Sequence, residues 1–280
     1  MLSYKHIFHA GNFADVLKHL VLQQILVYLG KKEAPYCLID THAGAGWYAL
    51  QNPQAQKNQE FNQGIAKLWQ QRECPKVVAD YVQLIKHFNP GTRLSHYPGS
   101  PLIMQHYLRS KDRLFLHELH PNEFELLTSV IKAERHIQIK QEDGLEASLK
   151  LLPPAERRGL IFIDPSYEIK EDYQRVVKTL KNMQQRFATG TYALWYPVVN
   201  RERNLGLEQS LRNSGIRNIQ LFELGQQRDS DAPGMTASGM IVINPPWTLK
   251  ADLQTALPWL ASHLGLPGVS SFRCEQLVAE

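Results

Sequence analysis

Short apolar runs alternate with segments of helical periodicity from Cys37 almost to the end of the chain. Strands and helices that alternate in this way build α/β folds, in which helices connect parallel strands. The pattern predicts strands at residues 37–40, 114–118, 137–140, 160–164, 191–196, 216–224 and 239–244, with helices at 122–132, 173–187 and 202–213. No helical pattern separates the last two strands, so we expect them to pair antiparallel. The prediction is a seven-stranded, mostly parallel, doubly wound sheet.

The interval between the first strand and the second is longer than a simple crossover needs. Residues 47–97 show helical spacing of apolar side chains and carry more Lys and Arg than Asp and Glu. We expect them to form an inserted helical subdomain, with residues 1–46 and 98–280 as the main domain. Its positive charge could contact a nucleic-acid backbone. A solvated helical cap that supports the site is an equally good interpretation.

Composition and charge limit the class of protein. The three cysteines of this 280-residue chain are far apart, which argues against a disulfide framework and against a cysteine zinc site. Residues 13–29 are apolar but interrupted by charged side chains, so we interpret them as an amphipathic helix rather than a membrane span. We find no signal peptide and expect a cytoplasmic protein. The net charge of +4 permits a polyanionic partner without demonstrating one.

A glycine-containing loop, Asp40-Thr-His-Ala-Gly-Ala-Gly46, directly follows the first strand. Glycine lets a ligand approach the backbone closely, so we expect cofactor contacts at Asp40, His42, Gly44 and Gly46. The spacing of Gly44, Gly46 and Ala49 also satisfies a relaxed dinucleotide fingerprint, which keeps a nicotinamide cofactor as an alternative. An acidic residue four positions before the first glycine is instead typical of methyltransferases that use S-adenosylmethionine (SAM). We favour SAM.

Three further carboxylates, Glu118, Asp143 and Asp164, stand at or just beyond the ends of successive predicted strands. Open α/β sheets bind ligands at the carboxyl ends of their strands. Glu118 is placed to bind ribose hydroxyls, and Asp143 with Gly144 to lie near the amino edge of an adenine. Each alone could be a helix cap. Their occurrence in order favours a cofactor site.

A helix is predicted to begin at Pro98-Gly-Ser-Pro101, because Ser is a preferred N-cap and Pro is favoured at the first helical position. The free backbone N–H groups at such a helix end suit an anionic ligand. This makes Ser100 a candidate cofactor-binding residue. Structural capping alone is the other interpretation.

The segment Asp164-Pro165-Ser166-Tyr167 resembles the Asp/Asn-Pro-Pro-aromatic motif of methyltransferases that act on amino or amide nitrogen. Adenine N6 is a poor nucleophile because its lone pair is delocalised into the ring. Hydrogen bonds from N6–H to the Asp164 carboxylate and the Pro165 carbonyl would localise that pair and stabilise the developing positive charge. Tyr167 would stack on the base. Ser166 departs from the motif.

A competing match, Asn244-Pro-Pro-Trp247, fits the same motif better by its letters. It follows the seventh predicted strand, whereas the motif should follow the fourth, which lies beside the cofactor strand. We therefore interpret it as a strand end enforced by proline.

The amino-terminal segment is unusually polar for one that leads into an apolar helix. Asn12 and Asp15 have the spacing of a capping box, which needs no function. Lys18 or His19 could meet the SAM carboxylate. Histidine pairs occur at metal-like spacings, but no third ligand is identifiable, so we expect no metal.

Several long blocks of the sequence resemble the bacterial 23S ribosomal RNA adenine-N6 methyltransferases of the J type. The blocks are Ser3-Tyr4, Phe8-His-Ala-Gly-Asn12, Ala14-Asp-Val-Leu-Lys-His19, Asp40-Thr-His-Ala-Gly-Ala-Gly46, Tyr97-Pro-Gly-Ser-Pro-Leu-Ile103, Arg158-Gly-Leu160 and Gly234-Met-Thr-Ala-Ser-Gly-Met-Ile-Val-Ile-Asn-Pro-Pro-Trp247. The resemblance implies a class I methyltransferase (Rossmann-like) fold with a helical insertion. It also implies a monomer that acts on protein-poor 23S rRNA, before full ribosome assembly, and leaves N6-methyladenosine.

The resemblance also implies roles for individual residues. Cofactor contacts fall at His19, His42, Ser100, Glu118, Asp143 and Gly144. Asp164 is catalytic, together with Pro165 and Tyr167, and Tyr4 with His6 reaches the target adenosine. The alternatives are a methyltransferase of DNA adenine or of a protein amide, and a nucleic-acid-binding relative that has lost catalysis.

Overall fold

The computed structural model describes residues 5–167, 171–230, 232 and 234–280. Its strands are β1 (Cys37–Asp40), β2 (Trp47–Ala49), β3 (His96–Pro98), β4 (Arg113–His117), β5 (Ile137–Lys140), β6 (Gly159–Ile163), β7 (Thr191–Val198), β8 (Ile219–Gly225), β9 (Ala237–Ile243) and β10 (Ser271–Val278). Its α-helices are α1 (Phe13–Gly30), α2 (Pro53–Asn58), α3 (Ile65–Leu68), α4 (Lys76–His87), α5 (Ser100–Tyr107), α6 (Pro121–Val130), α7 (Gly144–Leu151), α8 (Glu171–Arg186), α9 (Arg201–Arg212) and α10 (Leu249–Leu264), and two 3-10 turns are η1 (His6–Phe8) and η2 (Glu60–Gln63).

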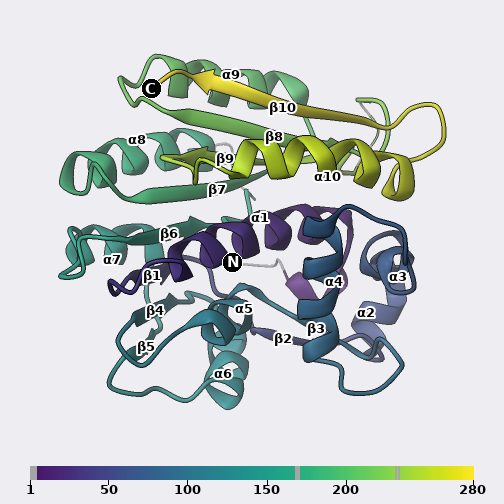
Figure 1. Ribbon diagram of the computed structural model, residues 1–280, viewed down its shortest axis with the longest axis horizontal. Coiled ribbons are helices and arrows are strands. Elements are labelled where there is room, and N and C mark those ends of the chain that lie inside the picture. The colour runs from purple at the N-terminus through teal and green to yellow at the C-terminus, as the bar shows by residue number, and fades with distance from the viewer. Residues whose placement is uncertain (1–4, 168–170, 231, 233) are drawn as a thin grey trace.

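The central sheet has the strand order β10-β8-β9-β7-β6-β1-β4-β5 (Figure 1). The five strands from β7 to β5 are parallel neighbours, with Cys37 of β1 opposite Gly159 on one side and Arg113 on the other. β9 is antiparallel to both β7 and β8, so the predicted antiparallel pairing of the last two expected strands is confirmed. This is the α/β class I methyltransferase arrangement that the resemblance implied.

The main sheet has eight strands where the sequence predicted seven. The additional strand, β10, pairs antiparallel with β8 at the edge of the sheet. Most of its side chains are exposed or half-buried, and Arg273, Glu275 and Gln276 interrupt its apolar residues. An edge strand needs only one apolar face, and this one has no regular alternation to reveal it.

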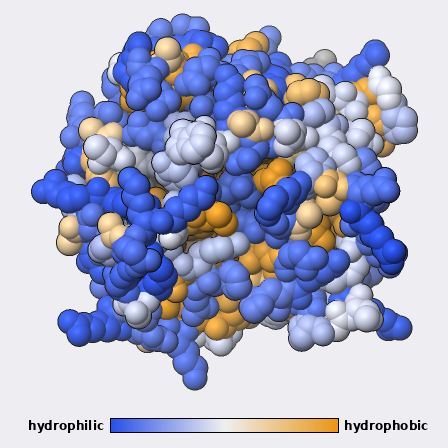
Figure 2. All heavy atoms as spheres, in the orientation of Figure 1, coloured by the Kyte–Doolittle hydropathy of each residue, from blue (hydrophilic) through white to orange (hydrophobic). Residues whose placement is uncertain are grey.

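Side chains alternate between the two faces of the sheet and form two apolar clusters. Leu38, Leu160 and Phe162 point to the face covered by α1, α4 and α10. Ile39 and Ile161 point to the opposite face, which α7, α8 and α9 cover. In Figure 2 the visible surface is mainly hydrophilic, with apolar atoms showing between the polar groups. The parallel strands are thus buried on both faces, as their apolar runs predicted.

Helix α1 is buried around almost its whole circumference, so the prediction of an amphipathic helix is wrong. Asp15, Lys18, His19 and Gln23 are all buried, as are the apolar side chains between them. Gln23 donates hydrogen bonds to the carbonyl of Asp80 and the hydroxyl of Tyr107. Polar side chains in this helix are therefore held by internal partners rather than by water.

Residues 47–97 contain the helices that their periodicity predicted, framed by the two-stranded sheet of β2 and β3. α4 packs against α1, and its buried Val78 and Tyr81 belong to the same apolar cluster as that helix. Figure 1 shows α4 standing beside α1. No helix among the described residues is both long and apolar enough to span a bilayer.

Candidate active site

A cavity of about 430 Å³ lies at the carboxyl ends of the parallel strands. This volume is within the range of roughly 300–1,000 Å³ typical of small-molecule sites. Eleven of the predicted site residues line it: His6, Lys18, His19, His42, Gly44, Ser100, Glu118, Asp143, Gly144, Asp164 and Pro165. Asp40, Gly46 and Tyr167 lie behind its wall, and Tyr4 falls outside the described residues.

The loop after β1 approaches its neighbours through backbone atoms. Gly44 has a φ of +60°, and its N–H donates a 2.8 Å hydrogen bond to Glu118 Oε2. Gly144, at the start of α7, packs so closely that a Cβ there would lie 2.1 Å from the carbonyl oxygen of Thr41. A side chain at Gly144 would push α7 away from the loop after β1, and one at Gly44 would meet the Tyr48 hydroxyl at 2.5 Å. Both glycines therefore shape the cavity wall.

Asp40 is fully buried under this loop and accepts a 3.2 Å hydrogen bond from the His42 backbone N–H. Burial raises its pKa to about 7, against the lowering effects of the Ser100 hydroxyl and of that backbone donor. The negative charge of nearby Asp164 raises it further. Burial also lowers the pKa of His42 to about 4, so this imidazole is neutral at pH 7. Asp40 thus supports the loop from behind.

Glu118 and Asp143 each brace the loops around them. Glu118 accepts backbone hydrogen bonds from Gly44 and, at 2.7 Å, from His120, while burial raises its pKa. Asp143 is the N-cap of α7 and also accepts a 2.5 Å hydrogen bond from Arg175. Burial acts to raise the pKa of Asp143, but Arg175 outweighs it and lowers the pKa. The capping role and the cavity position occur together.

Ser100 is the first residue of α5, and Gly99 is the N-cap. The predicted helix is present, but the prediction that Ser100 caps it is wrong by one position. Its hydroxyl interacts with the Asp40 carboxyl and acts to lower the pKa of that group. The side chain lines the cavity beside Asp40 instead.

Lys18 lies between two carboxylates at the centre of the site. Its Nζ is 2.6 Å from Asp164 Oδ2 and 2.9 Å from Asp15 Oδ1. Asp15 also accepts hydrogen bonds from His6 Nε2 and the Gly11 backbone N–H, at 2.9 and 2.8 Å. Burial acts to raise the pKa of Asp15, but these partners hold it well below its ordinary value. Asp15 is therefore ionised and couples His6 to Lys18.

The capping box expected at Asn12 and Asp15 is only half formed. Asn12 Oδ1 accepts a hydrogen bond from the Asp15 N–H and so caps α1. The Asp15 side chain turns instead to Gly11, His6 and Lys18. Sequence reasoning assigned Asp15 a purely local role and missed its contact with the site.

His19 is anchored by residues of the 47–97 insertion. Its Nδ1 lies 2.7 Å from the Tyr97 hydroxyl, which is 2.7 Å from the Tyr81 hydroxyl. Burial lowers the pKa of His19 to about 3, so the ring is neutral at pH 7. It can offer a ligand a neutral hydrogen bond, and the positive charge on this helix belongs to Lys18.

The segment after β6 places Asp164 and Pro165 on the cavity but not the ring of Tyr167. Tyr167 has a φ of +52° and is 9% exposed, and its hydroxyl donates a 2.9 Å hydrogen bond to the Trp195 carbonyl. Its ring packs 4.4 Å from that of Tyr173. Stacking of Tyr167 on a base stays a prediction, since the ring faces the protein in this structure.

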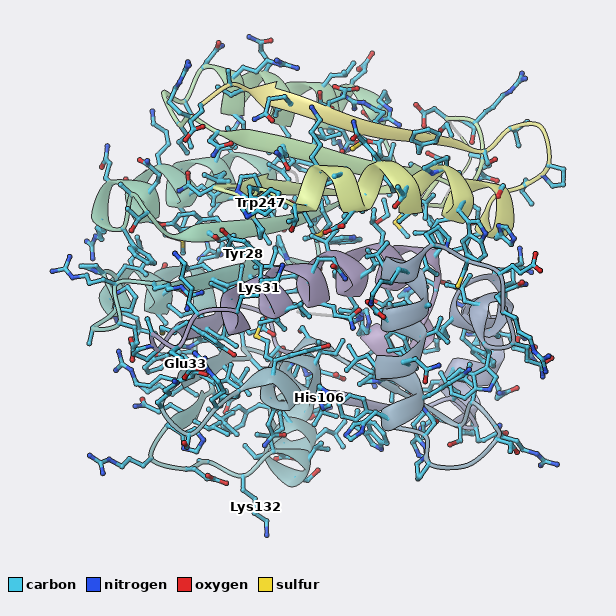
Figure 3. All side chains as sticks on the ribbon, in the orientation of Figure 1. Tyr28, Lys31, Glu33, His106, Lys132 and Trp247 are labelled. Carbon is cyan, nitrogen blue, oxygen red and sulfur yellow. The ribbon has the colours of Figure 1, made fainter. Side chains whose placement is uncertain are left out.

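The competing motif lies at the opposite edge of the sheet. β9 is antiparallel to β7, so Asn244 follows the end of β9 that adjoins the start of β7. Its side-chain amide donates hydrogen bonds to the carbonyls of Ala188 and Gly190. Trp247 is 79% exposed, at the surface just before α10 (Figure 3). This segment shares no cavity with Asp164.

Two further observations complete the site. No group of three or more His, Cys, Asp or Glu in the described chain could hold a metal ion. Trp195, which the sequence analysis did not single out, lines the cavity from β7. Its position inside a strand of apolar residues indicated only a core side chain.

Comparisons with known proteins agree with this geometry. Residues 33–276 match the family model described as Ribosomal RNA large subunit methyltransferase D, RlmJ. The chain is 47% identical to Ribosomal RNA large subunit methyltransferase J of Haemophilus influenzae and 48% identical to the protein of the same name from Escherichia coli K12. Each alignment covers 100% of both chains.

A solved structure shares the whole fold. The crystal structure of a Legionella pneumophila protein superposes with a TM-score of 0.88 at 39% identity, covering 96% of this chain and 98% of that one. The arrangement of strands and helices described above therefore occurs in an experimental structure of a similar sequence.

Proposed function

The chain belongs to the ribosomal RNA large subunit methyltransferase J family, and from this premise we propose that it methylates the N6 amino group of an adenine in 23S rRNA. The observation that carries the proposal is the position of Asp164. It lies on the cavity, and in the described chain its only hydrogen bond joins Oδ2 to Lys18. Its other oxygen is available to a substrate amino group.

The residues on the β1, β4 and β5 side of the cavity fit SAM as the cofactor. Gly44 and Gly144 present bare backbone to the cavity, and Glu118 and Asp143 provide carboxylates for hydroxyl and amino groups. His19, His42 and Ser100 offer neutral polar groups beside them. Asp40 and Gly46 shape the loop from behind. When bound, SAM supplies an electrophilic methyl group.

Asp164 and Pro165 are proposed to hold the target amino group. Hydrogen bonds from N6–H to the Asp164 carboxylate and the Pro165 carbonyl would localise the nitrogen lone pair. They would also fix the nitrogen in line with the methyl group, which lowers the entropic part of the barrier. The base must first leave its stack, at a cost of a few kcal/mol that is smallest in an RNA loop.

The charges around Lys18 favour a nitrogen that becomes positive during the reaction. Two carboxylates, Asp15 and Asp164, flank one ammonium group at 2.9 and 2.6 Å. In a site shielded from water, a carboxylate on the cavity wall acts strongly on charge that develops nearby. His6 is bonded to Asp15 and lines the cavity, which makes it a candidate to contact the target base. From the family resemblance we also propose that Tyr4 contacts the target adenosine.

The family supports an rRNA substrate. We propose a monomer that acts in the bacterial cytoplasm on protein-poor 23S rRNA, before ribosome assembly is complete. We also propose that residues 47–97 form a subdomain inserted into the main domain, whose Tyr81 and Tyr97 position His19.

The test is methyl transfer from isotope-labelled SAM to protein-free 23S rRNA, followed by nucleoside mass analysis. Double-stranded DNA and protein acceptors are run alongside. We expect labelled N6-methyladenosine from RNA alone. Label found in DNA or in a protein amide would show that the substrate is not 23S rRNA. SAM binding without label in any acceptor would indicate a relative that has lost catalysis.

A further inference from the structure

The cavity has a side that the cofactor residues leave uncovered. Most of those residues follow β1, β4 and β5, and His19 and Ser100 come from α1 and α5, whereas the reactive Asp164 follows β6. The next strand beyond β6 is β7, and it contributes Trp195 to the cavity. A group held by Asp164 and facing away from the cofactor residues therefore meets β7.

The indole of Trp195 is held in a fixed orientation. Its Nε1–H donates a 2.8 Å hydrogen bond to Ser238 Oγ on β9. Lys18 Nζ lies 5.5 Å from the ring centroid, and the same Nζ binds Asp164. The ring thus lies next to Asp164, which with Pro165 forms the proposed clamp on the target amino group. It is oriented before any substrate binds.

Tyr167, the aromatic residue of the motif, supports this ring rather than replacing it. Its hydroxyl bonds the Trp195 carbonyl and its ring is buried. The two ring centroids are 6.1 Å apart. The indole of Trp195 is therefore the aromatic surface that β6 and β7 present to the cavity among the described residues.

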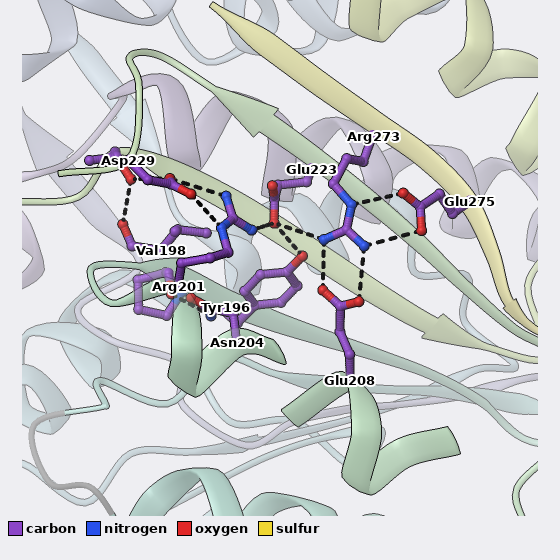
Figure 4. Close-up of polar contacts among 11 residues, drawn as sticks. Tyr196, Val198, Arg201, Asn204, Glu208, Glu223, Asp229, Arg273 and Glu275 are labelled. Atoms are coloured by element: carbon purple, nitrogen blue, oxygen red, sulfur yellow. Dashed lines mark hydrogen bonds and ion pairs between the residues drawn. The ribbon is translucent and has the colours of Figure 1, made fainter. Parts of the chain in front are cut away.

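The block Gly234–Trp247 contributes to this arrangement through two residues of β9. Ser238 anchors the indole, and a Cβ on neighbouring Gly239 would lie 2.1 Å from the ring of Tyr196. Tyr196 in turn donates to the buried Glu223, which also binds the half-buried Arg201 in an ion network (Figure 4). These contacts hold the end of β7 in place.

We propose that Trp195 forms the aromatic wall against which the target adenine packs, an inference that rests on the proposed function and names its base-binding residue. Every base has a π-face, so an indole beside the clamp binds adenine without specifying sequence. Loss of one base–aromatic contact typically weakens binding roughly 5- to 150-fold. The Lys18 ammonium contacts both Asp164 and the Trp195 ring and so holds them near each other.

The experiment compares two substitutions that both keep an apolar side chain. Trp195→Leu removes the aromatic face, and Trp195→Phe keeps one. Adenosine is titrated into each variant by calorimetry, SAM affinity is measured separately, and KM and kcat are measured on 23S rRNA. For the Leu variant we expect adenosine binding weakened about 5- to 150-fold and a raised KM for RNA. SAM affinity should stay at the wild-type value, and the Phe variant should retain most of the binding.

Controls separate this inference from folding and from the proposed function. Trp247→Leu makes the same substitution at an exposed tryptophan on the other edge and should leave adenosine binding unchanged. Ser238→Ala keeps the indole but removes its hydrogen bond, and we expect a smaller loss of adenosine affinity than for Trp195→Leu. Unchanged adenosine affinity in Trp195→Leu, or an equal loss of SAM affinity, would overturn the proposal. Wild-type protein that yields no N6-methyladenosine would instead overturn the proposed function.

Discussion

Two segments of this chain look alike in sequence and differ completely in position. Asp164-Pro165-Ser166-Tyr167 and Asn244-Pro245-Pro246-Trp247 each follow a buried apolar strand. Each contains a residue with positive φ, Tyr167 at +52° and Asn244 at +49°. The first faces the cavity, and the second lies at the opposite edge of the sheet.

The difference comes from strand direction. β6 runs parallel to β1, so its carboxyl end joins the edge where the cofactor loop lies. β9 runs antiparallel to β7, so its carboxyl end joins the amino ends of the parallel strands. The Asn244 segment matches the motif more closely in sequence, but it lies at the amino ends of the parallel strands and does not reach the cavity. Topology decides which of two similar motifs can be catalytic.

The largest expected effect is at Asp164. Asp164→Ala should lower kcat by at least about 10²- to 10³-fold, because it removes a preorganised acceptor for the target amino group. The fold should remain intact, since the side chain is a strand-end group rather than core volume. Methyl transfer to 23S rRNA, with circular dichroism as the folding check, measures both.

Asp164→Asn provides the matched control because it keeps the shape and removes the charge. Asn keeps an acceptor oxygen, as in the Asn form of the motif, so activity nearly as low as that of the Ala variant would show that the negative charge of Asp164 matters. Full activity in the Ala variant would contradict the assignment of Asp164 to the target amino group.

The next prediction concerns the free energy of unfolding, which we expect to depend on pH because of the buried Asp40. Asp40 has a folded-state pKa of about 7, raised by burial above its ordinary 3.8. The folded state therefore binds this proton more tightly, and stability is lost as pH rises from about 4 to 7 and then levels off. At about 1.4 kcal/mol per pKa unit, the loss is of the order of a few kcal/mol.

Asp40→Asn should remove this dependence. The free energy of unfolding of the variant minus that of wild type, from urea titrations at pH 4 to 8, should increase up to about pH 7. Asp80→Asn, at a solvent-exposed ion pair with Lys76, is the control. A difference for Asp40→Asn that stays constant with pH would show that the buried carboxyl is not the cause.

A third prediction concerns the opposite edge, where the effect should be on stability alone. Asn244→Ala removes two hydrogen bonds, to Ala188 and Gly190, and should lower the free energy of unfolding by about 1–3 kcal/mol. SAM affinity and kcat should not change. Asn244→Gly, which accepts the positive φ, separates the lost bonds from backbone strain. Loss of methyl transfer without loss of stability would move the active site to Asn244.

The sequence predicted the edge of the sheet that carries the site, because five apolar runs marked the parallel strands and polar residues followed four of them. Glu118, Asp143 and Asp164 each line the cavity at the carboxyl end of a parallel strand, as the sequence predicted. Local pattern sufficed there because the carboxyl ends of parallel strands meet at one edge.

Three features could not be predicted in this way, since each depends on contacts between distant segments. Asp15 had a sufficient local explanation as a cap, and its bond to His6 depends on how η1 folds back against α1. Trp195 has the pattern of a core residue, and its exposure to the cavity depends on Ser238 of another strand. The burial of α1 on all sides depends on α4 and α10, which periodicity within α1 does not reveal.

The smallest effect should come from restoring the motif with Ser166→Pro. Among the described residues Ser166 makes no hydrogen bond that a proline would remove. Proline would restrict Pro165 to extended conformations and reduce the freedom of the unfolded chain, which stabilises by about 0.4–1 kcal/mol where the geometry is compatible. Because Asp164 and Pro165 already line the cavity, kcat should stay close to that of wild type. Thermal unfolding and methyl transfer measure the two quantities. A large rise in kcat would mean that Ser166 leaves Asp164 and Pro165 loosely held in the wild-type protein.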